Sequence, residues 1–293
     1  MRFQGSGRDD DIQDRRGNPA PRAAAGLSLG GIAVVVVVAL LLGKNPLQLL
    51  GLLGQQNGSQ PSATSGGQPS PGPRNPAEAQ AEQLVRSATT DIQDFWTQSL
   101  PAMSNGTAYR RTQLVLFADA TTSSCGMAQA ATGPFYCPGD QLVYIDLGFY
   151  AELAQRFGAP GQFAQAYVLA HEFGHRIQDI LGIEARMRAG QRADPSQRNA
   201  LSVAMELQAD CFAGVWGASA SQRGMLDAGE VEQGLTAAAS IGDDRIQRMA
   251  GRTVSPERFT HGSSEQRVAW FRRGLSTGQI SACGTFGNGA MSP

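Results

Sequence analysis

The sequence predicts an α+β domain with a small N-terminal sheet and a helix-rich C-terminal half, preceded by one transmembrane helix. Strand-like apolar segments are confined to residues 112–150, whereas helical patterns fill residues 162–274. An uncharged apolar run covers residues 27–43, well before either group. The chain has 293 residues, of which 41% are hydrophobic. That length suits one medium-sized domain with accessory segments.

The apolar run "LSLGGIAVVVVVALLLG", residues 27–43, has about the minimum length that spans a bilayer. A buried core helix and a cleaved signal peptide are the alternatives. Polar segments flank the run, which argues against a core helix, and no small-residue cleavage site follows it. We therefore expect an uncleaved, single-pass anchor in a bacterial cell membrane.

The basic residues set the expected orientation of this anchor. Those before the run outnumber those just after it, which places the N-terminus in the cytoplasm and the rest in the periplasm or outside the cell. Residues 1–26 are polar and expected to be unfolded, and residues 55–76 form a disordered Gly/Ser/Pro linker. The folded domain is expected over residues 77–293. The basic residues concerned are Arg2, Arg8, Arg15, Arg16 and Arg22 before the run, and Lys44 after it.

Four cysteines lie in the expected outer domain, and sequence alone does not choose among their three pairings. The short loop between Cys125 and Cys137 favours that pair, which leaves Cys211 with Cys283. A structural zinc site would need shorter spacings between its cysteines. Disulfides in an oxidising compartment are therefore favoured.

The elements of the domain follow from apolar periodicity and from helix-end signals. The last helix begins with a capping box of Ser263 and Gln266, and we expect it to end at Gly274. Gly182 stops the central helix. The sequence predicts helices over residues 77–100, 162–181, 199–220, 230–249 and 263–274, and strands over residues 112–119 and 140–150.

The central helix carries the segment "AYVLAHEFGHRIQDILG", in which His171 and His175 are four residues apart. Residues at this spacing share one helix face, so both imidazoles can bind one metal ion. Glu172 lies beside them, where it can reach a metal-bound water without being a ligand. Zinc lowers the pKa of such a water to about 7, and a carboxylate can accept its proton. The alternative is a structural helix with two surface histidines.

A catalytic zinc site needs a third protein ligand. In "MELQADCFAG", Glu206 and Asp210 share one face of an otherwise apolar helix, and burying two carboxylates is costly unless they serve a site. We expect Glu206 to bind the metal and Asp210 to accept a hydrogen bond from a liganding histidine. A solvated Glu and Asp would be the alternative. The candidates for the third ligand are Glu184, Asp194, Glu206, Asp210 and His261.

Several segments together resemble the bacterial "putative neutral zinc metallopeptidase" family. They are "GPFYCPGDQLVYIDLGFY", "FAQAYVLAHEFGHRIQ", "ELQADCFAGVW", "IGDDRIQ" and "FTHGSSEQRVAWF". The H-E-x-x-H and E-x-x-x-D pair resembles the gluzincin arrangement, and the similarity extends over nearly the whole chain except the linker. The resemblance implies a zincin-like fold with His171, His175 and Glu206 as zinc ligands and Glu172 as catalytic base. It also implies that Asp210 orients a liganding histidine. The family typically has a second histidine where this chain has Arg176.

Other polar residues are weaker candidates for a role in catalysis, substrate binding or metal binding. His261 is a candidate for stabilising the oxyanion of a tetrahedral intermediate, and a structural histidine is the alternative. Tyr144 is a weaker candidate, on a strand that could form the edge along which a peptide lies extended. Asp243 and Asp244 are expected to pair with Arg245 or neighbouring arginines rather than to bind a second metal.

We therefore expect a membrane-anchored zinc endopeptidase that hydrolyses peptides or proteins, with Zn²⁺ as its cofactor. A non-hydrolytic, zinc-stabilised envelope scaffold and a cell-wall amide hydrolase are the alternatives. An intact Glu172 argues against the scaffold, which has no need of that carboxylate. The net charge of −1 argues against nucleic acid as the partner.

Overall fold

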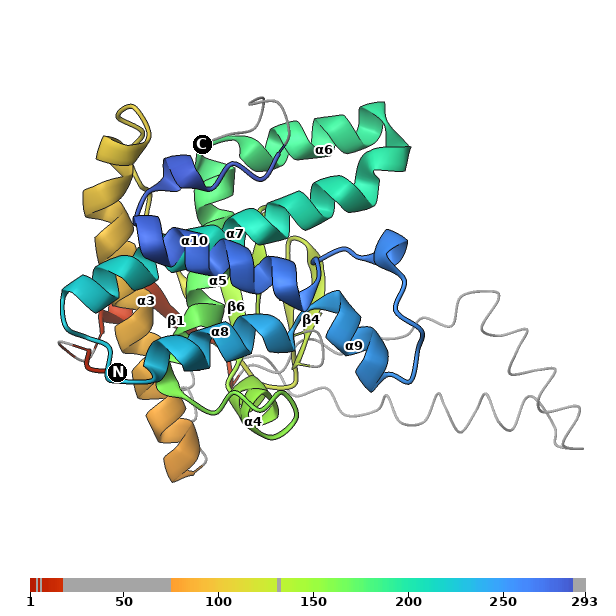
Figure 1. Ribbon diagram of the computed structural model, residues 1–293. Coiled ribbons are helices and arrows are strands. Elements are labelled where there is room, and N and C mark those ends of the chain that lie inside the picture. The colour runs from red at the N-terminus through yellow and green to blue at the C-terminus, as the bar shows by residue number, and fades with distance from the viewer. Residues whose placement is uncertain (4, 6, 18–74, 131–132, 287–293) are drawn as a thin grey trace, which may run out of the picture. The chain divides into compact units, whose positions relative to one another are not determined.

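The computed structural model describes residues 1–3, 5, 7–17, 75–130 and 133–286 (Figure 1). The expected membrane helix at residues 27–43 lies outside these ranges, as does nearly all of the expected linker. Over the described ranges, none of the helices combines the length and the apolar character that crossing a bilayer requires.

A four-stranded sheet forms one side of the domain, with strand order β1-β2-β6-β5. The first three strands run parallel, and β5 is antiparallel to β6 at the sheet's edge. A separate hairpin joins β3 to β4. The strands are β1 (Ile12–Asp14), β2 (Leu114–Phe117), β3 (Ala120–Ser123), β4 (Gly126–Gln129), β5 (Phe135–Cys137) and β6 (Leu142–Asp146).

The strand expected over residues 140–150 is shorter than predicted and is not an edge strand. Strand β6 is paired on both sides, by β2 and by β5, so it has no free edge for a peptide. The strand ends at Asp146, whose carboxylate accepts hydrogen bonds from the N–H groups of Asp119 and Gly148. The chain turns there and enters helix α4 (Gly148–Gln155).

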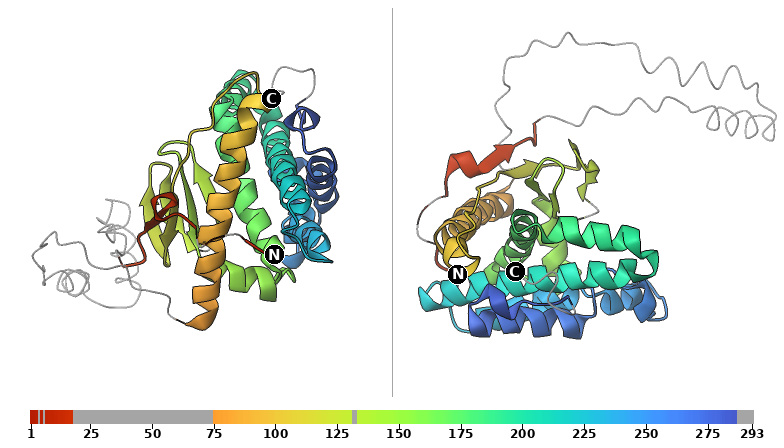
Figure 2. Two further views of the ribbon diagram at one scale, coloured as in Figure 1. Left: turned by 90° about the vertical axis from the view of Figure 1, so that its left-hand side faces the viewer. Right: turned by 90° about the horizontal axis from the view of Figure 1, so that it is seen from above.

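Helix α5 (Gln162–Ile180) is the centre of the domain and lies within one residue of its expected bounds. Helices α3 and α5 cover one face of the sheet, and α7 and α10 form a further layer on the far side of α5 (Figure 2). Fourteen residues of α5 are buried, including the histidine motif's first four positions. The long flanking helices are α3 (Pro76–Met103), α7 (Arg198–Gln222) and α10 (Ser264–Thr277).

The helical half differs from prediction at three points. The helix expected over residues 230–249 is broken at Ile241 and Gly242 into α8 (Glu230–Ser240) and α9 (Asp243–Met249). Helix α6 (Ile183–Ala193), which follows the left-handed Gly182, was not expected. The capping box of α10 is confirmed, but the helix continues past Gly274 to a left-handed glycine at 278. The short 3-10 helices among the described residues are Asp9–Asp11, Pro195–Gln197, Pro256–Arg258 and Ile280–Ala282.

Gly274 serves packing rather than helix termination. A Cβ atom at this position would overlap the carbonyl oxygen of Cys211 on α7. The missing side chain therefore lets the backbones of α10 and α7 approach closely. The nearby disulfide between Cys211 and Cys283 ties the same region together. A second disulfide joins Cys125 to Cys137. The two bonds confirm the pairing of the four cysteines that the sequence favoured.

The expectation that residues 1–26 are unfolded is wrong for residues 1–3, 5 and 7–17, the part that the structure describes. Strand β1 pairs with β2, and the α-amino group of Met1 lies 2.5 Å from the Glu230 carboxylate. The buried Asp11 carboxylate accepts hydrogen bonds from Arg111 and from the Thr90 hydroxyl. Composition concealed this because the segment docks through strand pairing and through charge pairs with the folded domain, and the charged partners lie 62 to 229 residues away.

Candidate metal centre

The site forms where helices α5 and α7 cross at Gly174. A Cβ atom there would lie 3.0 Å from the carbonyl oxygen of Ala209 and 3.1 Å from its Cα. Glycine in a helix interior costs about 1 kcal/mol relative to alanine, and here it permits close approach of the two helices. As a result, His171 and His175 on α5 face Glu206 and Asp210 on α7.

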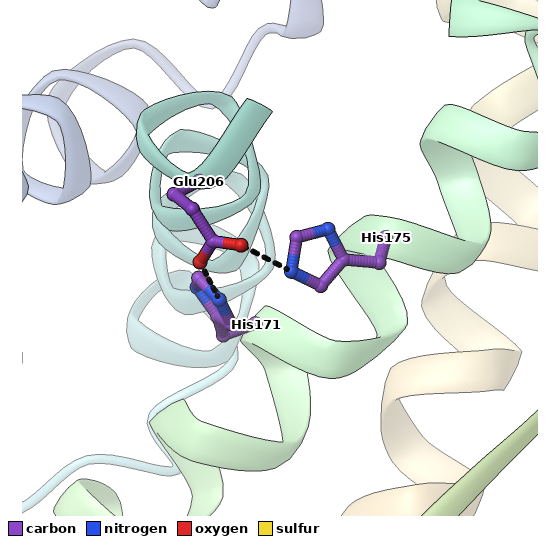
Figure 3. Close-up of side chains that lie close together, drawn as sticks. All are labelled: His171, His175 and Glu206. Atoms are coloured by element: carbon purple, nitrogen blue, oxygen red, sulfur yellow. Dashed lines mark hydrogen bonds and ion pairs between the residues drawn. The ribbon is translucent and has the colours of Figure 1, made fainter. Parts of the chain in front are cut away.

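Three potential ligand side chains converge at this crossing (Figure 3). The Nε2 atom of His171 lies 3.2 Å from Oε2 of Glu206, and Nε2 of His175 lies 3.6 Å from Oε1 of Glu206. One donor atom from each residue lies within 4.8 Å of the other two. Ligands in a tetrahedral zinc site are about 3.3–3.6 Å apart, given zinc–ligand distances of about 2.0–2.2 Å. The three residues therefore fit a zinc ion.

The outer nitrogen of each imidazole has a hydrogen-bond partner. Nδ1 of His171 lies 2.8 Å from Oδ1 of Asp210, and Nδ1 of His175 lies 2.8 Å from Oε1 of Gln178. Such bonds fix the tautomer and ring orientation of a liganding histidine. Nε2 of both rings is thus left to face Glu206, which is the arrangement that a metal site needs.

Asp210 is itself held by two further residues. Its carboxylate is fully buried and makes a two-pronged ion pair with the buried Arg267 on α10. The hydroxyl of Tyr167 lies 2.5 Å from Oδ1 of Asp210. A buried carboxylate would be costly without such partners. Arg267 thereby stabilises the residue that orients His171.

The electrostatic environment favours positive charge between the histidines and Glu206. Burial lowers the pKa of His171, but the charge and hydrogen bonds of Asp210 and Glu206 outweigh it and raise the pKa well above its ordinary value. Burial would raise the pKa of Glu206, yet the two imidazoles hold that pKa far below its usual range. The raised pKa of His171 and the lowered pKa of Glu206 have the same cause, which is the attraction between buried carboxylates and a positive charge.

Glu172 is buried next to the cluster, and one of its carboxylate oxygens is already engaged. The backbone N–H of Tyr136 on β5 donates to Oε2 of Glu172 at 2.9 Å. Burial raises the pKa of Glu172 above its ordinary value, against the opposing charges of the two histidines. A raised pKa brings a carboxylate closer to the range in which it can both accept and return a proton near neutral pH.

A cavity of about 570 Å³ opens beside these residues, and His261 lies in its wall. Its Nδ1 atom lies 3.3 Å from Oδ1 of Asp243, whose other oxygen accepts from the backbone N–H groups of residues 260–262. The hydrogen bond to Asp243 raises the pKa of His261, whose side chain is 51% exposed. Apolar side chains, including Phe135, Phe149 and Val168, line other parts of the cavity.

Other residues proposed from the sequence lie elsewhere. Tyr144 is not among the lining residues, and its hydroxyl contacts Asp140 instead. Glu184 lines the cavity but pairs with Arg188, and Asp194 caps the 3-10 helix at Pro195–Gln197. Asp244 pairs with Arg248, a neighbouring arginine as expected, whereas Asp243 pairs with His261. Neither Glu184, Asp194 nor Asp210 joins the cluster of three potential ligands.

Sequence reasoning missed four contributors to the site, and two of them had a readable signal. Gln178 is three residues after His175 and Tyr167 is four residues before His171, so helical spacing places both on the histidine face of α5. Tyr136 and Arg267 reach the site only through the packing of β5 and α10. No local pattern indicates those contacts.

The comparison with known proteins decides the family. The family described as "Putative neutral zinc metallopeptidase" matches residues 1–286. The chain belongs to this family. As a member of a zinc metallopeptidase family, it has Zn²⁺ as its cofactor, in agreement with the donor set described above.

Two curated proteins from different bacteria are similar to this metallopeptidase family member. It is 44% identical over 296 residues to "Uncharacterized protein YpfJ" of Escherichia coli, covering 98% of this chain and 99% of that protein. It is 37% identical over 213 residues to "Uncharacterized protein Rv2575" of Mycobacterium tuberculosis, covering 69% of each. No solved structure matches this chain.

Proposed function

We propose that this protein is a zinc-dependent endopeptidase in which His171, His175 and Glu206 hold the metal and Glu172 is the general base. The observation that carries the proposal is the convergence of three ligand atoms on a cavity that Glu172 also lines. The volume of about 570 Å³ lies within the range of ligand-binding clefts. Family membership supports peptide or protein as the substrate class.

The residues of this chain divide the chemistry between them. When bound, zinc supplies an acidified water and polarises the substrate carbonyl. Glu172 accepts a proton from the attacking water and returns it to the leaving amine. His261, held by Asp243, donates a hydrogen bond to the oxygen on which negative charge develops. Asp210 and Gln178 keep the two imidazoles oriented throughout.

The decisive experiment compares the wild-type protein with Glu172→Gln. We expect both proteins to contain one zinc per chain and only the wild type to cleave a broad peptide library. Cleavage by the variant at the wild-type rate would refute the role of Glu172. Casein and peptidoglycan zymograms run in parallel separate a peptidase from a cell-wall amide hydrolase.

A further inference from the structure

Arg176 is a buried cation next to the zinc motif, and the proposed mechanism does not use it. Its side chain is 2% exposed, although it lies directly after the second histidine. The guanidinium donates to the Arg110 carbonyl, to the Asp179 carboxylate at 3.1 Å and to the Tyr136 hydroxyl at 3.2 Å. A buried charge with this many partners holds its surroundings in one arrangement.

Tyr136 connects this cation to the proposed general base. Its hydroxyl donates to Asp179 at 2.7 Å, while its backbone N–H donates to Glu172 at 2.9 Å. Side chain and backbone of one residue therefore bind two points on the same helix. The two contacts fix both the position of strand β5 and the direction of the Glu172 carboxylate.

The spacing on α5 explains how both contacts are made. Glu172, Arg176 and Asp179 are at positions i, i+4 and i+7, so they share one face of the helix. Strand β5 packs against that face. It is an edge strand that pairs in the sheet with β6 alone, and its other attachments include the contacts of Tyr136 with α5 and the Cys125–Cys137 disulfide. Phe135 and Tyr136 of this strand also line the cavity.

We propose that Arg176 is a positioning residue which, with Asp179 and Tyr136, clamps β5 onto α5 so that the Tyr136 N–H orients Glu172 for proton transfer. This inference rests on the proposed function, in which Glu172 is the base. Misplacement of a catalytic group by about 1 Å can cost 100-fold in rate. The clamp therefore serves the rate of the chemical step more than substrate binding.

The test uses the full-length, zinc-loaded protein and three single variants. Tyr136→Phe removes only the hydroxyl, and Arg176→Gln removes the cation. Tyr144→Phe is the matched control, because its hydroxyl lies on the next strand and bonds to Asp140. We expect kcat to fall on the order of 10- to 100-fold in the first two variants, with KM within about twofold and zinc content unchanged. The control should keep wild-type values.

A second readout does not depend on activity. The backbone N–H of residue 136 should exchange its hydrogen faster than in the wild type in three variants, Tyr136→Phe, Arg176→Gln and Glu172→Ala. The backbone N–H groups of β2 and β6 should keep their wild-type exchange rates. The double variant of Tyr136→Phe with Arg176→Gln should lose little more kcat than either single variant, because the two residues act as one unit.

The outcomes separate this inference from the proposed function. If the wild type cleaves peptides but Tyr136→Phe and Arg176→Gln alter neither kcat nor Tyr136 exchange, the clamp is refuted and the function stands. An equal loss in Tyr144→Phe, or loss of zinc in the clamp variants, also overturns the clamp. If the wild type cleaves nothing while exchange responds as expected, the proposed function fails and the contact between β5 and Glu172 remains.

Discussion

Arg267 and Asp210 form a buried ion pair, with guanidinium nitrogens 2.8 and 2.9 Å from the two carboxylate oxygens. The pair links α10 to α7 directly behind His171, so the last helix of the domain supports the metal centre. If one of the two residues were removed, water could not take its place as a partner of the other, because Asp210 is fully buried and Arg267 is 2% exposed.

Replacing Arg267 with methionine should therefore destabilise the protein strongly. An uncompensated buried carboxylate costs about 3–5 kcal/mol. We expect a loss of that size in the free energy of unfolding, measured by urea denaturation. Arg272→Met, an exposed position on the same helix, is the control and should change stability by about 0.5 kcal/mol or less. Equal losses at both positions would contradict the account of the ion pair.

Glu206 should be required for zinc binding, and Glu184 should not. Both carboxylates line the cavity, but only Glu206 belongs to the cluster of potential ligands. We expect Glu206→Gln to purify with much less than one zinc per chain and Glu184→Gln to keep the wild-type content, measured by elemental analysis. Full zinc content in Glu206→Gln would exclude it as the third ligand.

The alkaline limb of activity should depend on Asp243. The hydrogen bond to Asp243 raises the pKa of His261 above its ordinary value, so His261 stays protonated to higher pH and loses its proton as pH rises through the raised pKa. Asp243→Asn lets that pKa fall, and the alkaline limb of kcat/KM should move to lower pH. Asp244→Asn, which alters the neighbouring carboxylate, should leave the limb in place. An unmoved limb in Asp243→Asn would show that His261 does not control it.

The two disulfides should contribute unequally to stability. Cys211 and Cys283 are 72 residues apart, whereas Cys125 and Cys137 are 12 apart. Loop-closure entropy predicts about 4 kcal/mol for the longer loop and about 3 kcal/mol for the shorter one. Urea denaturation of the two double-serine variants measures the difference. Greater destabilisation on removing the Cys125–Cys137 bond would argue against a purely entropic origin.

Local patterns were sufficient for the elements that carry the metal site. The bounds of α5 and α7 follow from apolar periodicity, and the spacing within each helix pairs its two key residues on one face. These are relationships between residues close in the chain, which helix geometry fixes before tertiary structure is known. The three potential ligands that converge at the crossing, together with Asp210, which orients His171, were therefore predictable.

What could not be predicted depends on contacts between elements. The apolar run of β6 does not by itself distinguish an edge strand from a central one, and only the sheet order reveals that β6 is paired on both sides. Gly274 has the sequence signature of a helix end, yet it is needed for the approach of α10 to α7. Arg267 and Tyr136 have no distinctive pattern in their own segments, because their importance arises from partners 57 and 36 residues away.

The pairing of strand β1 with β2 bears on which side of a membrane each part of the chain lies. Hydrogen bonding of Ile12–Asp14 to β2 requires both strands to share one compartment, whereas the single-pass anchor expected from the sequence would place them on opposite sides of the membrane. A single crossing would pull β1 out of the sheet. Since the described cysteines are all paired, Asp9→Cys or Arg272→Cys would supply the one free thiol among the described residues. A membrane-impermeant maleimide applied to intact cells should label both variants or neither, and labelling of only one would mean that β1 is undocked in the cell.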